Sequence, residues 1–328
     1  MDVAARRLFR QNLEMSRFLL LSRPADCGPI RSIGHLHPST DQPGACMRSC
    51  LSALLLCTLT LFSAAAAAAE TLERIRDSGT LKLGYRQDAA PFSFADSEGL
   101  PAGYSLALCE VVAKAVRSHL QREDIKVEYV LVTAETRFDA VQSGEIDLLC
   151  GASSITLERR KQVDFSLLTF VTGSSVLYRK DGPANFLDLV GQKVGVHGGT
   201  TTEEGLIRAL QEAGIEAEVV AVESHDEGLR ALEAGEVAAY FADRAILAML
   251  GRDAERPENL VLSDRFFSYE PYALALQRGD SDFRLLVDAA LARLYRSQEI
   301  GRIYQANFGN TQMSDLLRAT FTLQALPE

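Results

Sequence analysis

The sequence predicts an α/β protein built of two similar lobes, and three observations carry this prediction. Strand and helix patterns alternate from residue 70 onward, which is typical of a mixed, mostly parallel sheet flanked by helices. A weak internal repeat relates residues 137–151, RFDAVQSGEIDLLCG, to residues 229–243, LRALEAGEVAAYFAD. Two extended segments, 170–180 and 268–277, separate the middle of the chain from its flanks and predict a two-strand hinge.

The first lobe is expected to contain residues 70–172 and 272–328. Its apolar positions and glycines predict a helix at 71–77 stopped by Gly79, a strand at 81–85, a helix at 106–117, a strand at 126–132, a helix at 136–142 closed by Gly144 and a strand at 146–150. Helices at 282–294 and 300–308 are expected to return to this lobe after the middle segment.

The second lobe is expected to contain residues 173–271, including the hinge crossings. A strand at 194–196 leads into a glycine turn, and Thr201 or Thr202 is expected to cap a helix that runs through residue 209. A strand at 219–222 follows, and the apolar run 237–242 ends at Asp243. Open α/β sheets bind ligands at the carboxyl ends of their strands, so the cleft between the lobes is the expected ligand site.

The N-terminal region has the order of a secretory signal peptide. Residues 47–69 read MRSCLSALLLCTLTLFSAAAAAA, with a basic start, an apolar core and small residues at the end. We expect cleavage near residues 67–69 and export to the periplasm, and a retained membrane anchor is the alternative. Residues 1–46 show no fold pattern, and we interpret them as a non-native or disordered extension in front of a true start at Met47.

The chain is acidic. Its 34 Lys and Arg against 44 Asp and Glu give a net charge of −10, and removing residues 1–69, with seven basic and four acidic residues, leaves −13. No basic block occurs, so nucleic acid is not an expected partner. Of the six cysteines, only Cys109 and Cys150 follow the expected cleavage site, and either a disulfide or two buried thiols is compatible with the sequence.

The stretch GASSITLERRKQVDFS, residues 151–166, offers groups that bind a carboxylate. The hydroxyls of Ser154 and Thr156 and the backbone N–H groups of an expected helix start can donate hydrogen bonds. Arg159 can pair with both carboxylate oxygens at once. An ordinary helix cap with a surface arginine is the alternative.

Two further segments carry polar groups at strand ends. GGTTTE, residues 198–203, offers hydroxyls and backbone N–H groups, although capping alone would also explain it. Asp243 is a carboxylate that could meet an ammonium group. Its alternatives are pairing with Arg244 or capping the next helix.

Stretches over residues 70–310 resemble the solute-binding proteins of amino-acid ABC transporters, the bacterial extracellular solute-binding protein family 3. They are LKLGYRQDAAPFSFADSEGLPAGYSLAL, GEIDLLCGASSITLERRKQVDFS, VGVHGGTTTE and RLYRSQEIGRIYQANFG, and SITLER matches the family's Ser/Thr-Ile-Thr-x-x-Arg signature. The resemblance implies the two-lobed, hinge-bending type II periplasmic binding protein fold. It also implies that Ser154 and Arg159, with the Thr201 region, hold the α-carboxylate of an amino acid and that Asp243 holds its α-ammonium.

Within that family, the chain is most similar to the glutamate/aspartate-binding branch. The basic side-chain pocket of that branch is matched by Arg86 in GYRQD, Arg137 in AETRFDA and His225 in VESHDEG. A buried side-chain carboxylate needs such partners. The chain departs from the branch at the candidate Ala152 and at Ala134, where hydroxyls are usual, and each lost hydrogen bond would cost about 1 kcal/mol.

The resemblance implies a monomeric binding protein, without catalysis or cofactor, that closes on glutamate or aspartate and docks to an ABC permease in the inner membrane. The alternative from another class is a periplasmic cyclohexadienyl dehydratase, which uses the same fold, with Glu135 or Glu270 as general acid. Asp243 argues against this enzyme because prephenate has no ammonium group. Glutamine or another polar amino acid is an alternative ligand, and a sensor subunit is a third possible role.

Overall fold

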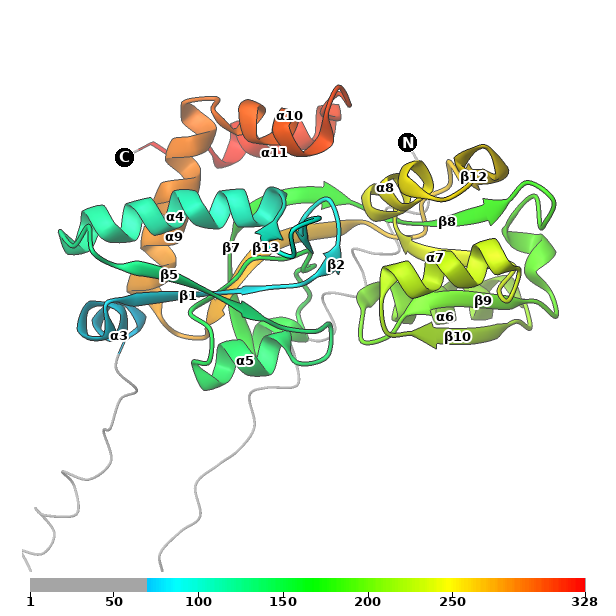
Figure 1. Cartoon of the computed structure of the whole chain (residues 1–328), viewed down its shortest axis with the longest axis horizontal. Coiled ribbons are helices and arrows are strands. Elements are labelled where there is room, and N and C mark those ends of the chain that lie inside the picture. The colour runs from blue at the N-terminus through cyan, green and yellow to red at the C-terminus, as the bar shows by residue number, and fades with distance from the viewer. Residues whose placement is uncertain (1–69, 328) are drawn as a thin grey trace, which may run out of the picture. The chain divides into compact units, whose positions relative to one another are not determined.

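A computed structural model of the chain describes residues 70–327, which contain two five-stranded sheets and one small three-stranded sheet (Figure 1). The expected extension at 1–46 and signal peptide at 47–69 lie outside the described residues and stay predictions. We call the first sheet with helices α3–α5 and α9–α11 the first lobe, and the second sheet with helices α6–α8 the second lobe.

The first sheet has the strand order β5-β1-β6-β13-β7. Its strands are β1 (Thr80–Tyr85), β5 (Lys126–Leu131), β6 (Leu148–Leu149), β7 (Val163–Thr172) and β13 (Glu270–Gln277). β1 pairs in parallel with β5 and β6, whereas β13 runs antiparallel to β6 and β7. The carboxyl ends of β1 and β6 therefore lie at one edge, and the segments that follow them can meet there.

Helices cover both faces of the first sheet. They are α3 (Thr71–Ser78), α4 (Tyr104–Leu120), α5 (Arg137–Ser143), α9 (Ser281–Arg296), α10 (Ile300–Phe308) and α11 (Asp315–Gln324). Figure 1 shows α4 and α5 on opposite sides of the sheet, and the alternation of buried side chains agrees: Leu148 belongs to the core cluster of α4, and Leu149 to that of α5. This two-sided burial explains why the strand reads as a continuous apolar run.

A disulfide joins α4 to the end of β6. The sequence is compatible with either a disulfide or two thiols at Cys109 and Cys150. In the structure their sulfurs are bonded, with 6.2 Å between the Cα atoms. One residue further on, the Gly151 carbonyl accepts a hydrogen bond from the Ser105 hydroxyl at 3.1 Å. The segment that leaves β6 is therefore fixed to α4 at two consecutive residues.

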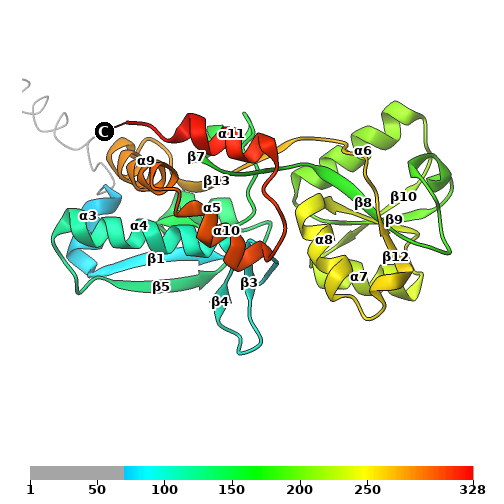
Figure 2. The ribbon, with the colours of Figure 1, turned by 90° about the horizontal axis from the view of Figure 1, so that it is seen from above.

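The second sheet has the strand order β10-β9-β11-β8-β12. Its strands are β8 (Ser174–Arg179), β9 (Lys193–His197), β10 (Glu218–Val222), β11 (Ala239–Asp243) and β12 (Leu260–Leu262), and its helices are α6 (Thr201–Ala213), α7 (His225–Ala234) and α8 (Arg244–Asp253). Figure 2 shows α6 on one side of this sheet and α7 and α8 on the other. Buried residues of β11 alternate accordingly, with Phe241 packing in the α6 cluster and Tyr240 and Ala242 in the other.

The two sheets repeat one scheme, as the internal repeat predicts. β6 and β11 are each the middle strand of their sheet, and each directly follows a short helix, α5 or α7. β6 pairs in parallel with β1, and β11 pairs in parallel with β9. The fold class is confirmed, although two of the four pairings in each sheet are antiparallel. The predicted lobe boundaries fall after β7 and within β13 and stay a prediction.

Three local expectations are wrong, and one small sheet was not expected. The strand expected at 146–150 has only two ladder residues, Leu148 and Leu149, because the pairing with β1 covers two positions. Thr200, not Thr201 or Thr202, caps α6, since its hydroxyl accepts from the Glu203 N–H. The helix start expected after residue 154 is only the 3₁₀ turn Arg159–Lys161. The small sheet of β2 (Asp88–Ala89), β3 (Ser93–Ala95) and β4 (Pro101–Ala102) was not expected.

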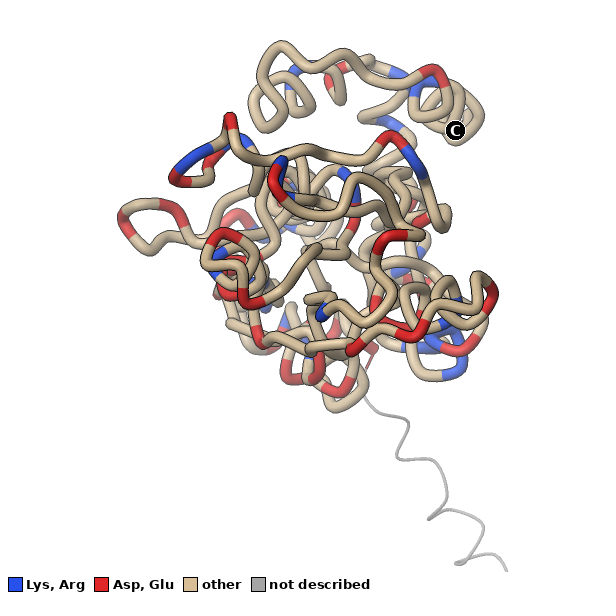
Figure 3. Tube along the Cα trace, turned by 90° about the vertical axis from the view of Figure 1, so that its right-hand side faces the viewer, with Lys and Arg blue, Asp and Glu red and all other residues tan. Residues whose placement is uncertain are grey.

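The surface of the described part carries mixed charge. Figure 3 shows Asp and Glu interspersed with Lys and Arg along the trace, without a continuous basic stretch in that view. Within residues 70–327, no helix combines the length and the apolar character that a bilayer span requires.

Candidate functional site

The segment after β6 presents the first polar groups of the site. Ser154 is buried and forms an isolated antiparallel bridge with Tyr272 of β13. The Ser154 carbonyl accepts a hydrogen bond from Arg159 Nη1 at 2.9 Å, which fixes the guanidinium over the segment. The Thr156 hydroxyl accepts from the Arg159 N–H at 3.0 Å. An α-helix was expected to begin in this segment, but the segment is a loop that is held by these two hydrogen bonds.

Two arginines share one aromatic ring beside this loop. The guanidinium carbons of Arg137 and Arg159 lie 4.6 and 5.0 Å from the centre of the Phe138 ring. Arg137, the first residue of α5, is 2% exposed. Burial, followed by the charges of Arg159 and Arg86, lowers the pKa of Arg137, but a guanidinium still keeps its charge in a protein.

Arg137 has donors without partners. Its Nη2 donates to the Gly199 carbonyl of the second lobe at 3.3 Å, while Nε and Nη1 are buried and have no acceptor among residues 70–327. A buried charged donor without an acceptor is costly. The arrangement therefore fits an anionic or carbonyl oxygen at this position.

Asp243 presents the opposite case at the end of β11. Its Oδ2 accepts from the Tyr272 hydroxyl, while its buried Oδ1 has no donor in the described part of the chain. Burial and then the charge of Glu270 raise the pKa of Asp243 to about 7. Asp243 precedes α8 without capping it through its side chain, so the free oxygen is available to a cation such as an ammonium group.

Thr201 connects the lobes across the site. Its hydroxyl lies 3.3 Å from the Ser154 hydroxyl of the first lobe and 2.9 Å from Oε2 of Glu270, the first residue of the hinge strand β13. Glu270 also accepts from the Ser268 hydroxyl at 2.6 Å. Thr201 has one hydroxyl hydrogen, so it can donate to only one of these two oxygens at a time. The Thr201 oxygen can accept a hydrogen bond as well.

A cluster of Arg86, Asp88, His197 and His225 forms the far end of the site. Arg86 donates from Nε and Nη2 to the two Asp88 oxygens at 3.0 and 2.9 Å, and Nη2 lies 2.7 Å from His197 Nε2. Burial opposes the ionisation of Asp88, but the hydrogen bond with His197 and the charge of Arg86 outweigh it and hold the pKa of Asp88 below its usual range.

This cluster contains ligand types that could hold a metal ion. Atoms of Asp88, His197 and His225 lie within 4.8 Å of one another. However, the Arg86 guanidinium contacts both Asp88 and His197, so a fixed cation already stands where a divalent ion would need to bind. The geometry therefore fits an arginine-centred ion cluster better than a metal site.

His225 is a neutral donor in this end of the site. Burial, and then the charges of Arg86 and His197, lower the pKa of His225 well below its usual value. Its Nδ1 lies 2.8 Å from the hydroxyl of the fully buried Tyr240. A buried hydroxyl hydrogen needs an acceptor, so we infer that Tyr240 donates to Nδ1 and that His225 carries its proton on Nε2.

All eight predicted site residues line one small cavity between the two lobes. Its volume is about 20 Å³, and the lining residues are Arg86, Arg137, Ala152, Ser154, Arg159, Thr200, Thr201, Thr202, His225, Asp243 and Ile246. This volume accommodates about one water molecule. An amino acid therefore needs the lobes to separate before it enters, as a hinge between two crossings allows.

Sequence reasoning missed several residues here. Thr200 and Thr202 belong to the GGTTTE run whose hydroxyls the sequence singles out, but only Thr201 was predicted as a site residue. Tyr272, which binds Asp243, carries no signal beyond its place in an apolar strand. Asp88 could have been found from its spacing, because in an Arg-x-Asp pair the carboxylate can accept two hydrogen bonds from the guanidinium.

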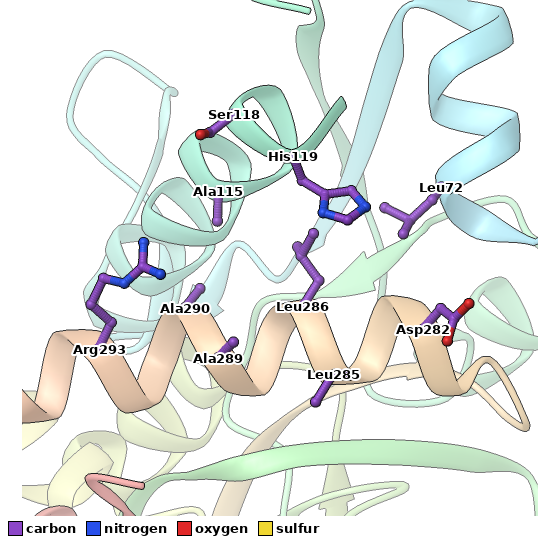
Figure 4. Close-up of a pocket in the computed structure, with 10 residues that line it drawn as sticks. All are labelled: Leu72, Ala115, Ser118, His119, Asp282, Leu285, Leu286, Ala289, Ala290 and Arg293. Atoms are coloured by element: carbon purple, nitrogen blue, oxygen red, sulfur yellow. The ribbon is translucent and has the colours of Figure 1, made fainter. Parts of the chain in front are cut away.

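A second cavity lies away from these residues. It has a volume of about 470 Å³ and lies among α3, α4 and α9, where Figure 4 shows Leu72, His119 and Leu286 around it. Its walls are mostly apolar, and no predicted site residue lines it. The cavity between the lobes is the smaller one, but it is lined by Arg137 and Asp243, whose buried polar atoms have no partner in the described residues, and we take it as the candidate functional site.

Two α/β lobes with a charged cavity between them define the architecture of a hinged ligand-binding protein. The comparison with known families agrees. The chain belongs to the bacterial extracellular solute-binding proteins, family 3, whose family model matches residues 81–310. The membership expected from the SITLER signature is confirmed.

Curated relatives and solved structures point the same way. The chain is 35% identical over 240 residues to the L-glutamate/L-aspartate-binding protein of Pseudomonas aeruginosa, covering 73% of this chain and 80% of the relative. It is 31% identical over 268 residues to the glutamate/aspartate import solute-binding protein of Salmonella typhimurium, covering 78% and 89%. The similarity to the glutamate/aspartate branch is therefore confirmed.

Among solved structures, the chain is similar to an ancestral amino acid-binding protein described as a precursor of cyclohexadienyl dehydratase. The TM-score is 0.63 at 29% identity, and the match covers 73% of this chain and 99% of that one. The two-lobed fold is thus common to binding proteins and to an ancestor of the enzyme that we considered as the alternative.

Proposed function

We propose that this protein is the periplasmic substrate-binding component of an ABC importer for the acidic amino acids glutamate and aspartate. The observation that carries the proposal is the pair of complementary buried groups in one cavity: Arg137 has free donors and Asp243 has a free acceptor. The names of the curated relatives support the ligand class.

In this proposal, each group of the ligand has its own partners. Ser154, Arg159 and Thr201, with Ala152 leaving space beside them, hold the α-carboxylate. Asp243 holds the α-ammonium through Oδ1, and Arg137, Arg86 and His225 hold the side-chain carboxylate. Affinity comes from buried charge pairs, and specificity comes from the cost of leaving those charges unpaired with the wrong ligand.

The cellular setting is part of the proposal. We propose that the signal peptide at 47–69 directs export, that the mature protein is a periplasmic monomer, and that the ligand-closed lobes dock to a permease of the inner membrane. Residues 70–172 and 272–328 would form one lobe, and residues 173–271 the other. Export through a bacterial envelope agrees with an extracellular family and with the disulfide.

The test is a calorimetric titration of the protein, unfolded and refolded to remove copurified ligand, with L-glutamate, L-aspartate, L-glutamine and prephenate. We expect tight one-to-one binding of the acidic amino acids. Arg159→Ala should abolish binding of every amino acid, whereas Arg137→Ala should weaken glutamate and aspartate most. Arg122→Ala is the matched control, since Arg122 pairs with Asp124 at the exposed surface away from the cavity.

Equal losses for all ligands in both pocket variants would contradict the assignment of the pocket. Consumption of prephenate, with no response to glutamate or aspartate, would move the protein to the dehydratase class. The site does not favour that class: burial opposes the ionisation of Glu135, but hydrogen bonds with Thr133 and the backbone and the charges of His197 and Arg137 together lower its pKa, whereas a general acid needs a raised pKa. Both oxygens of Glu270 already accept hydrogen bonds, from the Thr201 and Ser268 hydroxyls.

A further inference from the structure

The two arginines of the proposed side-chain pocket differ in how their charge is balanced. Arg86 is chelated by Asp88, two residues along the chain, through Nε and Nη2. Arg137 makes no ion pair among residues 70–327, and two of its nitrogens have no acceptor there. The far end of the site therefore holds two fixed cations and one fixed anion.

Asp88 does not line the cavity, but it is close enough to act on it. Its carboxylate contacts Arg86, which does line the cavity, and its charge is felt at His225 and Arg137, two other lining residues. The Asp88 side chain is largely buried, so solvent screens its charge weakly. A ligand carboxylate bound to Arg137 would therefore be repelled by Asp88 and attracted by Arg86.

We propose that Asp88 is a specificity-determining residue, because it offsets Arg86 and so limits how strongly the pocket prefers an acidic side chain over the matching amide. This inference rests on the proposed binding of glutamate and aspartate. Arg137 supplies the uncompensated positive charge that selects the acid. Asp88 leaves Arg86 mainly as a hydrogen-bond donor, a role that suits an amide oxygen as well as a carboxylate.

Glutamate and glutamine make the charge difference measurable, because they have nearly the same shape. The ratio of their dissociation constants, glutamine over glutamate, reports the electrostatic preference of the pocket and cancels effects common to both ligands. Asp88→Asn removes the negative charge and keeps the size. Arg86→Gln removes the positive charge, and the double variant removes both.

The expected order of the ratio follows from the charge balance. We expect Asp88→Asn to raise it at least tenfold over the wild type and Arg86→Gln to lower it at least tenfold. The double variant should return to within about threefold of the wild type. A residue with a purely structural role would weaken both ligands together and would leave the ratio unchanged.

The chain offers a matched control for Asp88→Asn. Arg122 and Asp124 have the same Arg-x-Asp spacing and the same contacts, Nε to Oδ1 and Nη2 to Oδ2, but both side chains are exposed. Asp124→Asn should leave the ratio unchanged. The titrations are run on the refolded protein at pH 8, where Asp243 is ionised, and weak glutamine binding is measured by competition against bound glutamate.

Each outcome decides one question. A ratio that is unchanged or lower in Asp88→Asn, in a wild type that binds glutamate, overturns this inference and leaves the proposed function intact. A wild type that binds neither acidic amino acid overturns the proposed function itself. If Asp88→Asn does not fold, the double variant must show a higher ratio than Arg86→Gln, and an equal or lower ratio overturns the inference.

Discussion

Asp243 should make the ligand-free protein less stable as the pH rises, and Asp243→Asn should remove that effect. The carboxyl is buried, and its pKa is raised from 3.8 to about 7. The folded state therefore holds a proton that the unfolded chain has already lost between these pH values. Stability falls as pH increases from about 4 and is lowest, with respect to this group, above pH 7.

The size of the effect follows from the difference between the two pKa values. One pKa unit corresponds to about 1.4 kcal/mol, so the complete penalty is about 4 kcal/mol, of which about 3 kcal/mol develops between pH 5 and 8. An asparagine copies the neutral acid, keeps an acceptor for the Tyr272 hydroxyl and cannot ionise. Relative to the wild type, the variant should gain about 3 kcal/mol over this pH range.

The assay is chemical denaturation of both proteins from pH 5 to 8 after ligand removal. Subtracting the two unfolding free energies cancels the other titrating groups. Asp124→Asn, at the exposed surface, should follow the wild type at every pH. Saturating glutamate should stabilise the wild type at pH 8 far more than it stabilises Asp243→Asn. A difference between wild type and variant that is the same at pH 5 and pH 8 would refute the reasoning.

Three further predictions concern the same site and its supports. Ligand affinity should fall up to tenfold per pH unit below about pH 7, because a protonated Asp243 cannot pair with an ammonium, and it should be constant above that value in calorimetry. Removing the disulfide by paired serine substitutions should cost about 4 kcal/mol of unfolding free energy, as closure of a loop of this length predicts. Gly228→Ala would place a Cβ about 2.1 Å from the Tyr240 ring, so it should shift His225 and cost about 1–3 kcal/mol, whereas Gly251→Ala, with only an ordinary contact at 3.5 Å, should not destabilise the protein.

Much of the fold could be predicted because apolar periodicity and helix-ending glycines are local signals. Gly79 and Gly144 each follow a helix in the left-handed conformation, which glycine adopts easily. β6 was predicted too long because apolar side chains do not reveal how many residues form ladder hydrogen bonds. Its two-residue ladder depends on β1, which lies more than 60 residues away.

The predicted site residues line one cavity, but their contacts were not predicted. The residues after β6, β9 and β11 were proposed because polar side chains at strand ends are typical of ligand sites in α/β sheets, and the cavity brings them together. The pairing of Arg86 with Asp88 and His197 was not found, since His197 comes from the other lobe. Tyr272 was not found because its hydroxyl only acquires a role when β13 brings it to Asp243.

The free energies that favour and oppose closure of the lobes should nearly cancel without ligand, so that ligand binding determines whether the closed form is populated. Closure is favoured by contacts between the lobes, among them Thr201 to Ser154, Arg137 to Gly199 and His197 to Asp88, each worth roughly 1 kcal/mol. It is opposed by buried donors of Arg137 and the free oxygen of Asp243, each costing about 1–3 kcal/mol without a partner. These terms are similar in size, so the closed form is favoured decisively only when one molecule supplies both an anion and a cation. The same groups that make glutamate and aspartate fit would therefore also make closure depend on them, which is what a transport protein needs if only its loaded form is to dock.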